Sequence, residues 1–318
     1  MDKTAKIFVA GHRGLVGSAM LRRLLAGGQT RILTKTRSEL ELTDQARVEA
    51  FFASEQPEYV FLAAAKVGGI LANSTLPAEF IRENLLIQTH VIDAAWRHGA
   101  RKLLFLGSSC VYPKFARQPI TEDQLLAAPL EPTNEAYAIA KIAGIRMCQA
   151  YRRQYGFRAI CPMPTNLYGP GDNFDPQNSH VLAALLRKFH EAKENGEPAV
   201  TVWGSGQPRR EFLHVDDFAD AALFLMERYD SAEIINVGTG KDIPIAELAG
   251  LIRGIVGYQG EIVFDPSRPD GTPRKLLDVS RLDALGWRPR ISFREGIEQT
   301  YNWYRQHVAT SQEALHHG

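Results

Sequence analysis

The sequence predicts an α/β protein: a doubly wound parallel sheet with a smaller, partly interleaved α/β domain for a substrate. Short β-branched segments alternate with longer helical patterns, which is typical of a parallel sheet covered by helices on both faces. The apolar segment 7–10 is followed at once by three glycines and a helical pattern. The 318 residues exceed the roughly 250–300 at which a single core tends to divide, so a second domain is expected.

The first half of the chain supplies the predicted sheet. β-Branched and aromatic residues favour strands at 5–10, 31–33, 59–63, 103–106 and 159–163. Helical patterns follow these strands at 15–26, 46–54, 79–98 and 136–155. Glycine and proline at 169–171 end this alternation. Beyond them we expect helices at 181–195, 218–228, 245–256 and 293–307, with strands at 200–203, 234–237 and 262–264.

Composition excludes several classes of protein. The 37 basic and 36 acidic residues nearly cancel, so nucleic-acid binding is not expected. No apolar segment approaches the roughly 20 residues that span a bilayer, and no leader segment is evident, so we expect no membrane contact and a cytoplasmic location. Cys110, Cys148 and Cys161 match neither a disulfide framework nor a zinc spacing, so no metal site is expected.

The glycine motif predicts a site for a dinucleotide. It comprises Gly11, His12, Arg13, Gly14, Leu15, Val16 and Gly17. Glycines permit a tight turn and close approach to a pyrophosphate, which rests on the helix N-terminus in a Rossmann-type domain. The G-x-x-G-x-x-G spacing is a variant of the dinucleotide fingerprint. A glycine-rich turn without a ligand is the alternative.

The segment after the second strand favours NADP over NAD. An NAD site places a carboxylate there, on the ribose 2′-hydroxyl. This chain has Arg37 instead, which together with Arg13 can bind a 2′-phosphate. Two solvated surface arginines are the alternative.

Ser108, Tyr137 and Lys141 predict ketone and alcohol chemistry. Tyr137 and Lys141 are four residues apart, so they share one helix face. A nearby ammonium favours the phenolate, so Lys141 is expected to lower the pKa of Tyr137. Ser108 follows a strand and can donate to a substrate carbonyl. A surface ion pair and a helix-capping serine are the alternatives.

With these motifs the chain resembles the extended short-chain dehydrogenase/reductase family over nearly its whole length. The resemblance is carried by segments 11–17, 62–69, 107–114, 164–170, 178–180 and 269–275. It implies an NADPH-dependent enzyme that acts on GDP-4-keto-6-deoxy-D-mannose, by 3,5-epimerisation and then 4-keto reduction. It also implies a homodimer that pairs the helices at 79–98 and 136–155.

Epimerisation explains Cys110, which a plain reductase does not need. Protons at C3 and C5 are α to the ketone, and inversion needs a base on one ring face and an acid on the other. The resemblance assigns Cys110 as the base and His180 as the acid. The alternatives are a buried structural cysteine and a structural histidine.

The same resemblance implies further contacts. For the cofactor these are Leu106, Gly107, Ser108, Ser109, Tyr137, Lys141, Pro164, Thr165, Asn166, Leu167 and His180. For the nucleotide sugar they are Lys188, Trp203, Arg210 and Asp270. The alternative interpretation of these residues is a packed tryptophan with ordinary surface charges. We expect residues 1–168 and 215–240 to form the NADP-binding domain, and 169–214 and 241–318 the nucleotide-sugar-binding domain.

Three other functions remain open at this point. A nucleotide-sugar 4-epimerase has no need for Cys110, and a 4,6-dehydratase typically carries a threonine with acidic residues where this chain has 109–111. A non-catalytic dinucleotide sensor has no use for Tyr137 beside Lys141.

Overall fold

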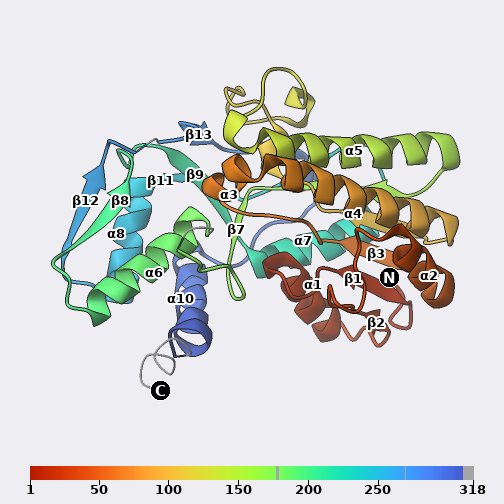
Figure 1. The fold of residues 1–318 in the computed structure, drawn as a ribbon, viewed down its shortest axis with the longest axis horizontal. Helices are drawn as coiled ribbons and strands as arrows, with labels where there is room; N and C mark the ends of the chain where they lie inside the picture. Colours follow the sequence, from red (N-terminus) through yellow and green to blue (C-terminus); the bar gives the residue numbers. More distant parts are fainter. Residues whose placement is uncertain (177–178, 269, 311–318) are drawn as a thin grey trace.

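A computed structural model describes residues 1–176, 179–268 and 270–310, and its larger part is built on a parallel sheet (Figure 1). The strand order is β2-β1-β3-β4-β5, with every neighbouring pair parallel. The strands are β1 (Ile7–Ala10), β2 (Ile32–Leu33), β3 (Tyr59–Leu62), β4 (Lys102–Phe105) and β5 (Ala159–Ile160). The strand predicted at 159–163 is divided in two, because β6 (Pro162–Pro164) pairs instead with β10 (Ile235–Val237).

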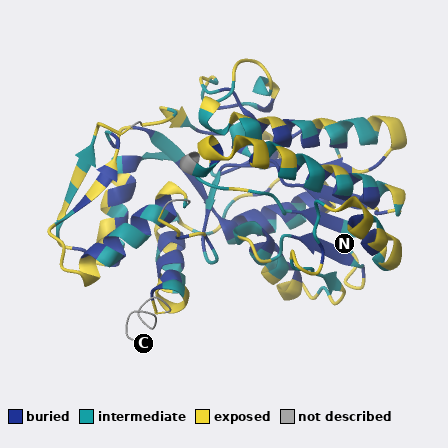
Figure 2. Cartoon of the chain, viewed as in Figure 1, coloured by how far each residue is buried: buried dark blue, intermediate teal, exposed yellow. Residues whose placement is uncertain are grey.

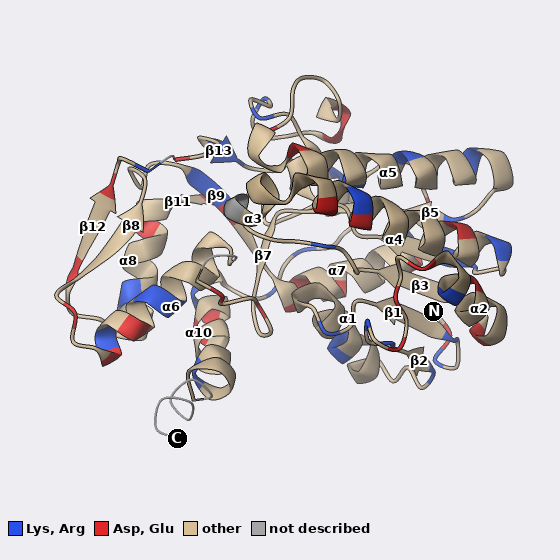
Figure 3. Ribbon diagram, viewed as in Figure 1, with Lys and Arg blue, Asp and Glu red and all other residues tan. Residues whose placement is uncertain are grey.

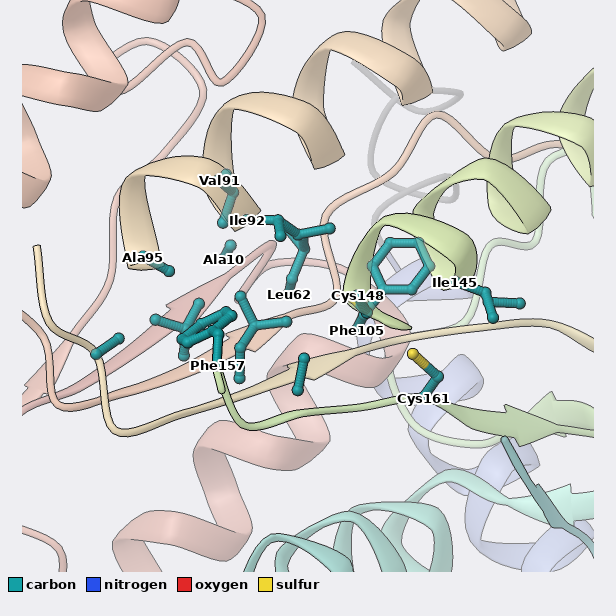
Figure 4. Close-up of a cluster of buried hydrophobic side chains, with 14 of the residues drawn as sticks. Ala10, Leu62, Val91, Ile92, Ala95, Phe105, Ile145, Cys148, Phe157 and Cys161 are labelled. Atoms are coloured by element: carbon teal, nitrogen blue, oxygen red, sulfur yellow. The ribbon is translucent and has the colours of Figure 1, made fainter. Parts of the chain in front are cut away.

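Helices cover both faces of this sheet, which confirms the doubly wound prediction. The helices of this part are α1 (Leu15–Ala26), α2 (Gln45–Glu55), α3 (Ile70–Thr75), α4 (Pro77–Arg97), α5 (Glu135–Tyr155), α7 (Val215–Arg228) and α9 (Ser280–Ala284). Phe8 and Ala10 pack into one core with residues of α2, α4 and α5. Figure 4 shows Ala10 in this core with residues of α4 and α5. Ile7 and Val9 point to the other face and pack with residues of α1 and α7. The alternation of side chains along β1 therefore supplies both cores. Figure 2 shows the strands of this sheet as mostly buried.

The smaller part is organised around β9 (Arg209–His214). This strand pairs with β7 (Asn166–Tyr168), β11 (Asp242–Pro244) and β13 (Arg274–Lys275). A separate parallel pair consists of β8 (Ala199–Trp203) and β12 (Glu261–Asp265). A third core lies among α6 (Val181–Glu194), α8 (Ile245–Val256) and α10 (Phe293–Tyr304).

Several element predictions were incomplete. The sequence analysis missed β7, β9, β11, β13, α3 and α9. The last helix was expected to run to His307, but α10 ends at Tyr304 and a π-helical turn follows over Arg305–Ala309. In the described part of the chain, no helix combines the length and apolar character that crossing a membrane requires.

Candidate active site

The glycine loop packs closely against the start of α1 and against the backbone after β3. Gly11 has φ +87°, and a Cβ on Gly17 would lie 2.1 Å from the Gly11 carbonyl oxygen. Helix α1 begins after Gly14 without a side-chain cap, so its first N–H groups are available to an anion. Within the described residues, the buried Nδ1 of His12 has no hydrogen-bond partner. These features fit the pyrophosphate of a dinucleotide.

Arg37 is exposed but already engaged by carboxylates. Its Nε donates to Glu41 Oε2 at 2.6 Å, and its Nη2 lies 3.6 Å from Glu83 Oε2. The hydrogen bond and charge of Glu41 raise the pKa of Arg37. Hydrogen bonds from Thr36 are the main reason that the pKa of the Glu39 carboxylate is lowered. The charge of Arg13, which lies nearby, lowers it further. Both arginines therefore border the loop after β2.

Ser108, Tyr137 and Lys141 converge at the end of β4. Lys141 Nζ donates to the Leu106 carbonyl at 2.8 Å and lies 5.8 Å from the Tyr137 ring centroid. Ser108 precedes a 3₁₀ turn over Ser109–Val111, and its Oγ accepts from the Cys110 N–H at 3.2 Å. The structure thus brings the predicted reducing group together.

The pKa of Tyr137 is shifted in the opposite direction from our prediction. Burial and the nearby Cys110 raise it above its ordinary value, while a hydrogen bond with Ser108 acts in the other direction. Burial lowers the pKa of Lys141 to about 8, and its ammonium donates to Leu106. The prediction that Lys141 lowers the pKa of Tyr137 was therefore wrong for this arrangement. A protonated phenol suits a proton donor.

Cys110 lies half-buried beside a lysine that the sequence analysis did not select. Lys275 Nζ, on β13, donates to Cys110 Sγ at 3.5 Å. Burial opposes ionisation, but the charge of Lys275 and hydrogen bonds from Ser108, Lys275 and Asn134 together lower the pKa of Cys110. These neighbours favour the thiolate, which is the form that acts as a base.

His180 lies near enough to Lys275 to feel its charge. It is exposed and immediately precedes α6. Protein atoms around the ring and the charge of Lys275 lower its pKa. Cys110 and His180 are therefore grouped around one ammonium. Asn178 and Pro269, which belong to the segments 178–180 and 269–275 of the sequence analysis, lie outside the described residues.

The four predicted sugar-nucleotide residues also lie close to one another. They lie near β9 and β13, which carry basic residues (Figure 3). Trp203 is 63% exposed, and Lys188 Nζ lies 5.0 Å from its ring centroid. Asp270 accepts from the Ser205 N–H at 2.7 Å and from its hydroxyl at 2.8 Å. Burial lowers the pKa of Arg210, and the charge of Asp270 opposes that shift. An exposed tryptophan between cations is suited to stacking on a base or sugar.

The remaining predicted cofactor residues line the ends of β4, β6 and β7. A Cβ on Gly107 would lie 2.0 Å from Met163 Cε, so this wall is tightly packed. Ser109 and Thr165 are buried, and Leu106, Pro164, Asn166 and Leu167 lie beside them in the chain.

Glu211 is a further residue that sequence reasoning missed. Thr165 Oγ1 and Asn166 Nδ2 donate to its carbonyl oxygen at 3.2 and 2.7 Å. Its carboxylate accepts from the N–H groups of Thr239, Gly240 and Leu277 at 2.6, 2.8 and 2.8 Å. It fixes the segment that carries Lys275. Its only local signal is an acidic residue directly before the apolar pair Phe212 and Leu213, in a strand that begins with two arginines.

Comparisons with known proteins identify the family of this chain. Residues 7–238 match the NAD dependent epimerase/dehydratase family, and the chain belongs to that family. GDP-L-fucose synthase 1 of Arabidopsis thaliana is 63% identical over 307 residues, covering 96% of this chain and 95% of that protein. A GDP-6-OMe-4-keto-L-xylo-heptose reductase from C. jejuni is 39% identical, with a TM-score of 0.92 and coverage of 96% and 99%. A GDP-L-fucose synthetase from Naegleria fowleri bound to NADP is 27% identical, with a TM-score of 0.89 and coverage of 98% and 97%.

Proposed function

We propose that this chain catalyses the GDP-L-fucose synthase reaction, which converts GDP-4-keto-6-deoxy-D-mannose to GDP-L-fucose with NADPH. The observation that carries this proposal is the grouping of Cys110 and His180 around Lys275, next to Ser108 and Tyr137. A reductase needs only Ser108 and Tyr137, whereas an epimerase/reductase also needs Cys110 and His180. The high identity to the Arabidopsis relative supports the same substrate.

Epimerisation is assigned to Cys110 and His180. The Cys110 thiolate takes the proton from C3 or C5, and the electron pair of that C–H bond moves into an enolate. Ser108 and Tyr137 donate to the enolate oxygen, as an oxyanion hole does. His180 returns a proton to the opposite face, which inverts the carbon.

Reduction is assigned to Tyr137. NADPH, when bound by the glycine loop with Arg13 and Arg37, supplies the hydride for C4. Tyr137 holds its proton because burial raises its pKa, and it gives that proton to the forming C4 alkoxide. Lys141 orients the end of β4 through Leu106. Lys188, Trp203, Arg210 and Asp270 hold the GDP portion.

Deuterium exchange separates the two reactions. Without NADPH and in D₂O, the wild type should exchange deuterium into C3 and C5 of the substrate, while Cys110→Ser should not. A serine hydroxyl is a far weaker acid and does not supply a usable base. With NADPH, Cys110→Ser should still oxidise the cofactor by reducing the ketone that has not been epimerised.

Tyr137→Phe is the matched control for the other reaction. It should retain exchange, supported by Ser108, but lose NADPH oxidation. Normal exchange in Cys110→Ser would remove Cys110 from the mechanism. Absence of exchange in the wild type would leave only a reductase, like the C. jejuni protein named above.

The assembly and the division of the chain are part of this proposal. We infer a homodimer in the cytoplasm, in which α4 and α5 pair with the same helices of a second copy. These helices pack on each other within the chain, and Ile139 and Tyr155 of α5 are 42% and 44% exposed. Residues 1–168 and 215–240 would hold NADP, and 169–214 and 241–318 the nucleotide sugar. Sedimentation equilibrium at micromolar concentration tests the dimer, which a monomeric mass would contradict.

A further inference from the structure

Lys275 is held in place from both sides. Its strand β13 is parallel to β9, with Lys275 opposite Arg210. The next residue, Leu276, donates its N–H to Gln118 Oε1 at 2.9 Å and accepts from the Ile120 N–H at 2.8 Å. The Leu277 N–H donates to the buried Glu211 carboxylate. The backbone around Lys275 is therefore fixed, and its side chain extends from a rigid strand.

The charge of Lys275 is not neutralised by an acidic side chain. Three cations line a small cavity of about 50 Å³ next to Cys110: Lys114, Arg274 and Lys275. Lys114 lies 3.0 Å from Glu131, and Arg274 is paired with Asp242. Over residues 1–176, 179–268 and 270–310, no carboxylate pairs with Lys275. Its ammonium instead faces a sulfur atom at 3.5 Å.

We propose that Lys275 is a further residue of the epimerisation: the fixed positive charge that holds Cys110 as the thiolate base before each inversion. This inference rests on the proposed function. A positive charge beside a cysteine favours the thiolate, and here the charge has no competing acidic partner. The direction of the pKa shift of Cys110 agrees with this role.

The need for such a charge follows from the proton balance. Each inversion moves a proton from carbon to Cys110 and another from His180 to the same carbon. The site is then left with a thiol and a neutral imidazole. Before the second carbon can invert, the thiol must lose its proton to water and His180 must gain one. Lys275 promotes the first of these steps, and the small cavity beside Cys110 is large enough for about one water molecule.

The other groups around Cys110 do not supply an unpaired positive charge beside the sulfur. Ser108 and Asn134 are uncharged donors, and Tyr137 and His180 face the site from α5 and from the start of α6. Lys114, Glu131 and Arg274 line the cavity as members of ion pairs. Lys275 is the cation that contacts the sulfur directly, and within the described residues no carboxylate pairs with it.

Alkylation of Cys110 by iodoacetamide tests the proposal without substrate or cofactor. The rate is measured from pH 5 to pH 10 in the wild type, Lys275→Met, Lys275→Gln and Lys275→Arg. Cys110→Ser gives the blank, because Cys148 and Cys161 are only 1% and 2% exposed. We expect the Met and Gln variants to react at least about tenfold more slowly at pH 7, with the profile moved to higher pH. Lys275→Arg should stay near the wild type.

Lys114→Met is the matched control, since it removes a cation from the same cavity but one paired with Glu131. Its profile should not move. Wild-type profiles in both neutral variants of Lys275, with folding verified by circular dichroism, would overturn the proposal. So would an equal shift in Lys114→Met. Absence of C3 and C5 exchange in the wild type would instead refute the proposed function and leave the alkylation result intact.

Discussion

Asp172 is a buried carboxylate whose removal should stabilise the protein in alkaline solution and not in acid. It is 8% exposed in the loop after β7. Its Oδ1 accepts from the Asn173 N–H at 2.7 Å, but Oδ2 has no partner among the described residues. Burial raises the pKa of Asp172 from 3.8 to about 7.

The direction in which stability changes with pH follows from where the Asp172 proton binds more tightly. Because the folded state binds this proton more tightly than the unfolded chain, its contribution to stability is complete below pH 4 and is lost as pH rises through about 7. The difference between the two pKa values corresponds to about 4 kcal/mol. In Asp172→Asn no charge is buried, but the amide N–H₂ lacks a partner, which costs about 1–3 kcal/mol. The net gain at pH 8 is therefore about 1–3 kcal/mol.

Urea unfolding at pH 5 and pH 8 measures this effect. The free energy of unfolding of Asp172→Asn should exceed that of the wild type at pH 8, and the difference should disappear at pH 5. Glu261→Gln, at an exposed position in β12, is the control and should stay within about 0.5 kcal/mol at both pH values. If the variant differed from the wild type equally at pH 5 and pH 8, the burial argument would be refuted.

Three further predictions concern the cofactor, the acid and the sheet. Arg37→Ala should weaken NADPH binding about 10- to 100-fold more than NADH binding, because a charged hydrogen bond to the 2′-phosphate is lost. Fluorescence titrations measure both affinities, and equal losses for the two cofactors would exclude that contact. Tyr137→Phe should reduce NADPH oxidation at least about 100-fold with little change in cofactor affinity, and near-normal turnover would identify another acid. Lys102, which is 2% exposed, donates to the carbonyl oxygens of Leu225, Met226 and Tyr229 at 3.2, 2.7 and 2.6 Å. Lys102→Met removes these three hydrogen bonds, although the Leu225 carbonyl keeps the Tyr229 N–H, and should lower the free energy of unfolding by about 2–4 kcal/mol, which an unchanged urea midpoint would contradict.

Sequence reasoning succeeded where the chemistry depends on residues close in the chain. Tyr137 and Lys141 are related by one helical turn, and the glycine motif is defined by spacing alone, so both could be read directly. Lys275 is 165 residues from Cys110, and no local pattern connects them. Their proximity arises only when β13 pairs with β9.

Two errors have identifiable physical causes. The strand β9 was missed because Arg209, Arg210 and Glu211 interrupt its apolar pattern, yet Glu211 is fully buried and satisfied by backbone donors. The pKa of Tyr137 was predicted from one neighbour, Lys141. In the structure, burial is the main cause that raises the pKa of Tyr137, and burial depends on the whole tertiary environment.

The position of Glu211 also bears on how the chain acquires its structure. This one residue joins segments of β6–β7, β10–β11 and β13, at sequence separations of 46, 28 and 66 residues. None of these bonds can form until distant parts of the chain have met, and such contacts slow folding because loop-closure entropy must be overcome first. A fragment that ends near residue 240 would lack Leu277, and one that begins there would lack Glu211 itself. The two parts are therefore expected to gain their native form together, and fragments expressed separately should need each other to do so.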